Sequence, residues 1–193
     1  MIIQYIIGPA GSGKTTLTKA LVDYIQSYNK EISVVSINLD PAVDYLPYTP
    51  DINIQDYITL DEIVQKKGLG PNGAMIAATD EMVNYVEELK YEISQYNNPE
   101  YIIVDTPGQM ELFSFRNSGP MIANAIGFGN VRRGILFCYD ATMCQHPNGL
   151  ISTLLLAASV QYRFANLPIT NVLTKKDLLS PDRLELLLQW IDD

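Results

Sequence analysis

Gly8-Pro9-Ala10-Gly11-Ser12-Gly13-Lys14-Thr15 decides the fold of this chain, because it fits the phosphate-loop pattern G-x-x-x-x-G-K-[ST]. The apolar, β-branched run at residues 2–7 predicts a buried strand before this stretch. From Lys14 to about Asn29, apolar residues recur at three- and four-residue steps and predict an amphipathic helix. A strand, a glycine loop and a helix in this order present backbone N–H groups and a positive helix end to phosphates. The alternative is a chance glycine-rich turn, which the two flanking patterns disfavour.

The stretch also assigns candidate roles to side chains. Lys14 would add its charge to the β- and γ-phosphates, and the Thr15 hydroxyl would ligate Mg²⁺. The candidate phosphate-binding residues are Gly11, Ser12, Gly13, Lys14, Thr15 and Thr16.

Composition narrows the class of protein. The chain has 193 residues, 47% of them hydrophobic, which predicts one domain with one core over residues 1–193. Its formal net charge of −9 disfavours direct binding to nucleic acid or to anionic membranes. The apolar runs are too short to span a bilayer, and the two cysteines, Cys138 and Cys144, form no metal-ligand pattern. We therefore expect a cytoplasmic protein with a buried thiol at Cys138 and a surface histidine at His146.

Five apolar runs, at residues 2–7, 33–39, 101–104, 134–139 and 169–173, alternate with helical patterns. This alternation predicts an α/β fold, a mostly parallel sheet flanked by helices. Sites of such sheets lie outside the carboxyl ends of the strands. The residues that follow the five runs are Gly8, Asp40, Asp105, Asp140 and, after the last run, Lys175 and Asp177.

Residues 41–100 form a long insertion that is repeatedly broken by prolines, among them Pro41, Pro47, Pro50 and Pro71. Thr59-Leu60-Asp61-Glu62 predicts a capping box that opens a short helix, and Lys66-Lys67-Gly68 predicts its end. Gly70-Pro71-Asn72-Gly73 predicts a tight turn. A longer helix is expected from about residue 79 to 95, with one apolar face formed by Met82, Val86, Leu89 and Ile93.

Asp105-Thr106-Pro107-Gly108-Gln109 follows an apolar run, as the aspartate of a Walker B element does. Asp105 would hold Mg²⁺, and Gly108 would let the backbone approach a γ-phosphate. Gln109 is a candidate for orienting an attacking water. By itself Asp-x-Pro-Gly indicates only a turn, but about ninety residues after a phosphate loop it predicts a switch segment.

Thr174-Lys175-Lys176-Asp177 fits the guanine-recognition pattern [NT]KxD. The Asp177 carboxylate would accept hydrogen bonds from N1–H and the exocyclic amine of guanine, and adenine offers neither donor there. The Lys175 stem can pack over the base. A charged strand-to-helix turn is the alternative, and the two preceding motifs favour base recognition over it.

Asn38-Leu39-Asp40-Pro41 is the least specific of these patterns. Asp40 would touch the Mg²⁺ hydration shell or serve as a base for water, although a helix-capping or turn aspartate would look the same.

Taken in order, these motifs resemble the GPN-loop GTPases, a family of P-loop GTPases of archaea and eukaryotes. The stretches that carry the resemblance are 8–16, 38–42, Gly70-Pro71-Asn72, 105–111 and 174–177. The Gly-Pro-Asn tripeptide inside a long insertion is the namesake of the family.

The resemblance implies a GTP-hydrolysing, Mg²⁺-dependent switch that binds GTP and GDP and acts as a dimer, here a homodimer. Asn72 of one subunit would reach the γ-phosphate side of the other subunit's site. Asp40, Asp105, Gln109 and Glu111 would hold Mg²⁺ and the attacking water. Eukaryotic relatives act in RNA polymerase assembly, which implies a protein client and no direct contact with nucleic acid or membrane.

Two departures from the family pattern matter. Thr174 replaces an asparagine found in many GTPases, so we expect a looser base-binding loop. Family members also continue past the equivalent of Asp193 with another base-contacting loop and further helices, so the C-terminal part of the family domain is expected to be absent from this sequence.

Two other functions fit the same motifs. A nucleotide-dependent kinase would need an acceptor site and usually an arginine-bearing lid, and the few arginines here do not cluster. An assembly factor with incidental hydrolysis would share every motif. Arg116 is the one candidate for an arginine finger, and a surface ion pair is the favoured interpretation.

Overall fold

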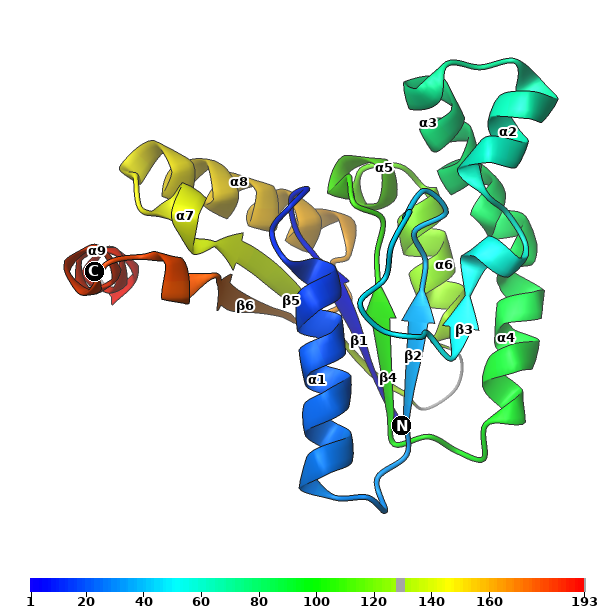
Figure 1. The fold of residues 1–193 in the computed structure, drawn as a ribbon, viewed down its shortest axis with the longest axis horizontal. Helices are drawn as coiled ribbons and strands as arrows, with labels where there is room; N and C mark the ends of the chain where they lie inside the picture. The colour runs from blue at the N-terminus through cyan, green and yellow to red at the C-terminus, as the bar shows by residue number, and fades with distance from the viewer. Residues whose placement is uncertain (128–130, 193) are drawn as a thin grey trace.

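The computed structural model describes residues 1–127 and 131–192, which form a sheet covered by helices (Figure 1). The strands are β1 (Ile2–Ile7), β2 (Val34–Asn38), β3 (Ile52–Asn53), β4 (Tyr101–Asp105), β5 (Arg132–Asp140) and β6 (Ile169–Thr174). The α-helices are α1 (Lys14–Tyr28), α2 (Leu60–Lys67), α3 (Pro71–Glu81), α4 (Val86–Gln95), α5 (Met110–Ser114), α6 (Ser118–Ile126), α7 (Ala141–Cys144), α8 (Pro147–Arg163) and α9 (Pro181–Asp192). Single 3₁₀ turns are η1 (Ile54–Asp56), η2 (Met82–Tyr85) and η3 (Lys176–Leu178).

The sheet has the strand order β3-β2-β4-β1-β5-β6, and every neighbouring pair is parallel. The predicted α/β class is therefore confirmed, and all five predicted strands are present. Because the strands are parallel, their carboxyl ends form one edge, which in Figure 1 runs from the upper ends of β2 and β4 to the left-hand ends of β5 and β6. The sequence analysis missed β3, whose two residues pair with the end of β2 and belong to the stretch expected to be an insertion.

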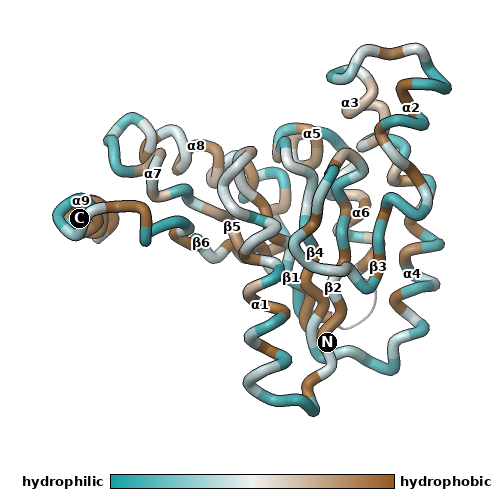
Figure 2. Tube along the Cα trace, viewed as in Figure 1, coloured by the Kyte–Doolittle hydropathy of each residue, from teal (hydrophilic) through white to brown (hydrophobic). Residues whose placement is uncertain are grey.

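Each face of the sheet has its own apolar layer. Helix α1 packs on one face, where Leu17, Leu21 and Ile25 meet a small cluster that includes Ile6 and Ile103. The neighbouring residues of each strand point the other way, as the two-residue period of a strand requires. They join the larger core formed with the remaining helices. Figure 2 shows the hydrophobic residues concentrated in the central strands.

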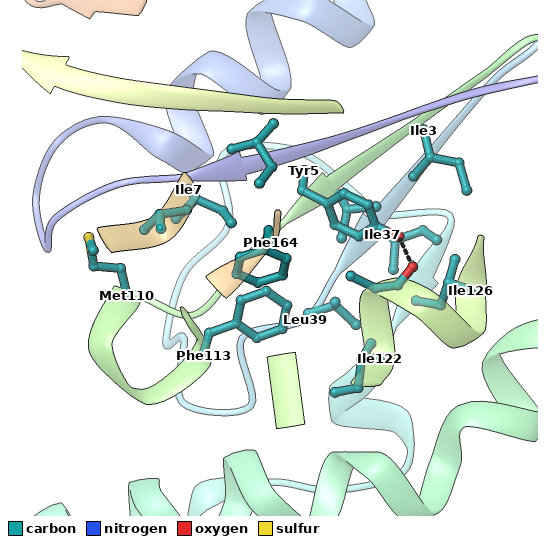
Figure 3. Packing of buried hydrophobic residues seen from close by; sticks show 14 of the residues in the cluster. Ile3, Tyr5, Ile7, Ile37, Leu39, Met110, Phe113, Ile122, Ile126 and Phe164 are labelled. Atoms are coloured by element: carbon teal, nitrogen blue, oxygen red, sulfur yellow. Dashed lines mark hydrogen bonds between the residues drawn. The ribbon is translucent and has the colours of Figure 1, made fainter. Parts of the chain in front are cut away.

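The larger core is built from fully buried aliphatic and aromatic side chains (Figure 3). The rings of Phe113 and Phe164 stack at a centroid distance of 6.3 Å, which fastens α5 to the end of α8. The Tyr5 hydroxyl donates to the carbonyl oxygen of Ala123 at 3.0 Å, so its burial leaves no unpaired donor. Burying each such side chain contributes about 1.5–3 kcal/mol, so this core dominates the stability of the carboxyl edge it supports.

Helices α2 and α3 form a hairpin beyond the β3 side of the carboxyl edge (Figure 1). The predicted capping box is confirmed, because Thr59 and Glu62 exchange side-chain-to-backbone hydrogen bonds and Gly68 ends α2 in the left-handed region. The predicted tight turn at residues 70–73 is wrong. Gly70 caps α3 and Pro71 is its first residue, a position where the missing N–H of proline costs nothing.

The helix expected over residues 79–95 is also only partly correct. Helix α3 runs to Glu81, and η2 separates it from α4. The predicted apolar face is confirmed, since Met82, Val86, Leu89 and Ile93 are all buried. The apolar stretch at residues 119–129 predicts either a groove for a client or part of the core. Ile122 and Ile126 of this stretch are fully buried in the core, and residues 128 and 129 lie outside the described residues.

Two further expectations are confirmed. Cys138 is buried, and His146 is exposed at the start of α8. Over residues 1–127 and 131–192, no helix is both long and apolar enough to cross a bilayer.

Candidate nucleotide-binding site

The phosphate loop connects β1 to α1, as the sequence predicts. Gly11 and Gly13 have φ angles of +72° and +88°, in the left-handed region that favours glycine. Gly8 has a different reason to lack a side chain: a Cβ there would lie 2.8 Å from Ser12 Oγ and 2.9 Å from Cys138 Cβ. The loop is therefore folded closely against β5, with its backbone free to curve around a phosphate.

Lys14 is buried beneath this loop. Its Nζ donates to the carbonyl oxygens of Gly8 (2.9 Å), Pro9 (3.1 Å) and Gly108 (2.9 Å). Burial lowers the pKa of Lys14, while the carboxylates of Asp105 and Asp40 act in the opposite direction. The three carbonyls hold the ammonium where the β- and γ-phosphates of a bound nucleotide would compete for it.

Asp105 ends β4 and is 1% exposed. Burial raises its pKa to about 6, although the Thr15 hydroxyl, the Lys14 charge and the Tyr48 hydroxyl favour the ionised form. The Tyr48 hydroxyl donates to Asp105 Oδ2 at 3.3 Å, whereas Oδ1 is buried without a hydrogen-bond partner in the described structure. An unpaired buried carboxylate oxygen is costly, so this atom is suited to a cation or a water that a cation holds.

Asp40 reaches the same place from the end of β2. Its Oδ2 accepts from the Gly108 N–H at 2.8 Å, and its Oδ1 accepts from the Ala42 N–H at 3.0 Å. The buried Asn38 side chain fixes this turn by accepting from the Asp40 N–H (3.0 Å) and donating to the Asp40 carbonyl (3.2 Å). Asp40 therefore joins the β2 loop to the switch segment.

The donor set fits Mg²⁺, which prefers oxygen ligands and in nucleotide sites takes a hydroxyl, phosphates, waters and one or two carboxylates. Thr15, Asp105 and Asp40 are such donors, and the unpaired Oδ1 of Asp105 is the observation that supports the fit. Among the described residues, no three Asp, Glu, His or Cys side chains form a cluster that would hold a metal without a nucleotide.

Gln109 and Glu111 stand at the start of α5, directly after Gly108, and both side chains are exposed. Glu111 lies close enough to Lys14 for its charge to oppose, in part, the lowering of that lysine's pKa by burial. Thr16, in the first turn of α1, is exposed as well. The structure thus brings Gly108 and Glu111 of the predicted switch segment close to Lys14 of the phosphate loop.

The base-recognition segment follows β6. The Thr174 hydroxyl lies 2.7 Å from the carbonyl oxygen of Ser12 and 3.0 Å from that of Tyr139, so it ties this segment to the phosphate loop and to β5. The threonine thus keeps a direct link to the phosphate loop, and the looser loop expected from the asparagine-to-threonine difference stays a prediction. Asp177 is exposed in η3, at the same sheet edge.

Asn72 is the predicted site residue that the structure does not bring to the others. It is the second residue of α3 and is exposed, and Figure 1 shows the α2–α3 hairpin beyond the β3 side of the sheet, apart from the phosphate loop at β1. A salt bridge from Lys67 to Glu81 braces the hairpin.

Arg116 forms a bidentate ion pair with Asp80 on α3, with Nε donating to Oδ1 at 2.8 Å. The surface ion pair favoured by the sequence analysis is thus present, and it links α3 to the segment after α5.

Sequence reasoning missed three residues that shape the site. Tyr48 lies in a proline-rich loop and nothing in the sequence indicates its contact with Asp105. Asn38 was quoted only as part of a motif, without its role in holding Asp40. Asp140 follows the fourth predicted strand, which was the available signal, and it binds Lys175 Nζ at 2.7 Å.

An all-parallel sheet with a phosphate loop after β1 and a buried aspartate after the neighbouring strand β4 defines a P-loop nucleotide-binding protein. A family model described as "Conserved hypothetical ATP binding protein" matches residues 6–193. The chain is 32% identical to a GPN-loop GTPase of Pyrococcus abyssi over 193 residues, which is all of this chain and 74% of the relative. It belongs to the GPN-loop GTPase family.

Other comparisons agree. A "GPN-loop GTPase 2 homolog" of Dictyostelium discoideum is 35% identical over 91% of this chain and 55% of its own length. A crystal structure described as a GTPase in apo form from Pyrococcus abyssi has a TM-score of 0.86 at 30% identity, covering all of this chain and 74% of that one. Cobyrinic acid a,c-diamide synthase from Mycobacterium smegmatis (TM-score 0.58, 15% identity, 100% of this chain and 82% of that one) shares the fold alone. The chain spans about half the length of several curated relatives it matches.

Proposed function

We propose that this chain is a Mg²⁺-dependent GTPase that binds GTP, hydrolyses it to GDP and phosphate, and acts as a homodimeric switch. The observation that carries the proposal is the convergence of the phosphate loop, the Asp105–Gln109 segment and the Thr174–Asp177 segment on one sheet edge, in a member of the GPN-loop GTPase family.

We assign each part of the reaction to particular residues of this chain. The phosphate loop and Lys14 bind the phosphates and stabilise the charge that develops on the γ-phosphoryl group. Gln109 and Glu111, on the exposed first turn of α5, orient the attacking water. Thr15, Asp105 and Asp40 would hold Mg²⁺, which neutralises phosphate charge when bound. Asp177 selects guanine.

Asn72 would serve the partner's site. An exposed amide on a braced hairpin that is set apart from its own phosphate loop is suited to a site on another molecule. Gly108 is hydrogen-bonded to both Lys14 and Asp40, so a change in the ligands of these two residues would shift Gly108. Loss of the γ-phosphate would in this way change the contact between the subunits.

The family resemblance also supports a role in the assembly of protein complexes such as RNA polymerase. The protein would bind a protein client, and it would do so in the cytoplasm. Both cysteines are free and buried, which agrees with a reducing compartment.

Turnover with GTP and with ATP, followed by phosphate release in the presence of Mg²⁺, tests the proposal. We expect hydrolysis of GTP well above that of ATP. Asp177→Asn should lose GTP affinity and gain xanthosine triphosphate affinity, because the new amide donates where the carboxylate accepted. Asp182→Asn, in the first turn of α9, is the matched control. Equal use of ATP and GTP would overturn guanine selection by Asp177.

A further inference from the structure

We propose that Asp140 is a positioning residue for guanine recognition, because its carboxylate holds Lys175 and thereby fixes the turn that presents Asp177. This inference rests on the proposed guanine-nucleotide function and adds a residue outside the recognition motif to it.

The two residues are placed together by the sheet. Asp140 is the last residue of β5, and its register partner on β6 is Thr174, the residue before Lys175. Lys175 Nζ lies 2.7 Å from Asp140 Oδ2. The Asp140 side chain is 12% exposed and that of Lys175 is 34% exposed, so the pair is partly shielded from water at the carboxyl edge.

The Asp140 carboxylate also accepts hydrogen bonds from a residue other than Lys175. Its Oδ1 accepts from the Thr142 N–H at 2.9 Å and from the Thr142 hydroxyl at 2.6 Å, as the cap of α7. Burial alone would raise the pKa of Asp140, but the hydrogen bonds from Lys175 and Thr142 outweigh it and leave the pKa below its ordinary value. The second oxygen is therefore an ionised acceptor with a fixed direction.

Lys175 adopts an unusual backbone conformation. Its φ of +55° lies in the left-handed region, and in the described residues Asn98 is the one other non-glycine residue with a positive φ. The turn continues directly into η3, where the Leu178 N–H donates to the Lys175 carbonyl at 3.0 Å. Asp177 lies inside this turn, so the conformation of Lys175 sets the direction of the Asp177 carboxylate.

The pair stands at the nucleotide site rather than elsewhere on the surface. Asp140 and Lys175 line one pocket of about 500 Å³ together with Pro9, Gly11 and Ser12 of the phosphate loop. The rest of this pocket is lined by residues of α7 and α8, so the ion pair between Lys175 and Asp140 lies between these helices and the phosphate loop. A partly exposed ion pair usually contributes little to the stability of a fold. Because the pair formed by Asp140 and Lys175 lies beside the phosphate loop, we assign it a role in recognising the base.

Calorimetric titration with GDP and with inosine diphosphate tests the proposal. Inosine diphosphate lacks the exocyclic amine, so the ratio of the two affinities reports how well Asp177 is aimed. Asp140→Asn should weaken GDP binding about tenfold, the order of one charge-assisted hydrogen bond, and lower the ratio of GDP to inosine diphosphate affinity. Its melting temperature should stay near the parental value.

Lys175→Met should reproduce this effect, and Lys176→Met, which removes the same charge from the neighbouring exposed position, should bind GDP as the parent does. Asp140→Asn combined with Lys175→Met should be no weaker than either single variant, because both remove one interaction.

Parental affinity and ratio in Asp140→Asn would overturn the proposal, as would additive losses in the double variant. Equal losses for both nucleotides with a lowered melting temperature would also overturn it, in favour of a structural role. Should Asp140→Asn not fold, a parental affinity ratio in Lys175→Met would overturn the proposal by itself. Failure of the parent to bind GDP would instead contradict the proposed function.

Discussion

The ammonium of Lys14 donates a hydrogen bond of 2.9 Å to the carbonyl oxygen of Gly108, ninety-four residues away along the chain. This contact joins the phosphate loop after β1 to the segment after β4, because the two strands are parallel neighbours in the sheet. Phosphate oxygens compete for the same ammonium. Nucleotide binding is therefore expected to change the conformation of the segment that carries Gln109 and Glu111.

Lys14→Ala should lose nucleotide affinity and GTP hydrolysis together, because the same charge acts on bound phosphates and on the transition state. Fluorescent GDP titration and phosphate release measure the two effects. Lys19→Ala, which removes an exposed lysine of the same helix, is the control and should change neither. Hydrolysis at the parental rate in Lys14→Ala would contradict the assignment of the phosphate loop.

Gly8→Ala should destabilise the protein and weaken nucleotide binding, because the new methyl group would meet Ser12 Oγ at 2.8 Å and Cys138 at 2.9 Å. Overpacking of this kind typically costs about 1–3 kcal/mol in the free energy of unfolding. Thermal unfolding measures the cost. Gly73→Ala is the control, since its methyl group would make ordinary contacts with Leu69. A Gly8→Ala variant as stable as its parent would show that the loop is not packed against β5.

The thiols should resist alkylation in the folded protein. Burial raises the pKa of Cys138 to about 12 from the ordinary value near 9, and burial also raises the pKa of Cys144. A raised pKa means that the reactive thiolate is scarce at pH 8 and increases only as the pH approaches the raised value. Mass spectrometry after iodoacetamide treatment at pH 8 should show both thiols unmodified in the native protein and modified in denaturant. Rapid native modification of Cys138 would contradict its burial.

Asn72→Ala should lower kcat with little change in GDP affinity, if the amide acts chiefly on the transition state. Loss of one such donor typically costs ~10²–10³ in kcat, and less where water takes its place. Asn97→Ala, at an exposed turn after α4, is the matched control. Steady-state kinetics and GDP titration separate the two effects, and a large loss of GDP affinity would argue against a transition-state role.

Elements with a signal in their own stretch of sequence could be predicted from the sequence alone. The phosphate loop, the five long strands and the Thr59–Glu62 capping box follow from spacing and composition, and each is present. Strand β3 was missed because two residues just after Pro50 carry no periodic signal, and only their pairing with β2 makes them a strand. The Gly70–Gly73 stretch was misread because proline and glycine mark turns and helix starts alike, and helix packing decides between them.

The same distinction between local signals and tertiary contacts applies to the residues of the candidate site. Motif residues were found because their chemistry is specific to their spacing. Tyr48 on Asp105 and Asp140 on Lys175 were not found, because each contact joins segments that only the tertiary fold brings together. The contacts of Thr174 were not predicted for the same reason, because the carbonyl groups it meets belong to Ser12 and Tyr139, on other elements.

The most direct test of the account is a mixing experiment with Lys14→Ala and Asn72→Ala subunits, because it asks whether hydrolysis needs the phosphate loop of one subunit and the Asn72 of another. In a mixed dimer, one of the two sites combines an intact phosphate loop with an intact Asn72. We expect phosphate release from GTP to return in part when the two inactive variants are mixed under conditions that allow subunit exchange. A mixture that forms mixed dimers, shown by differential tagging and co-purification, yet stays as inactive as its parents would contradict it.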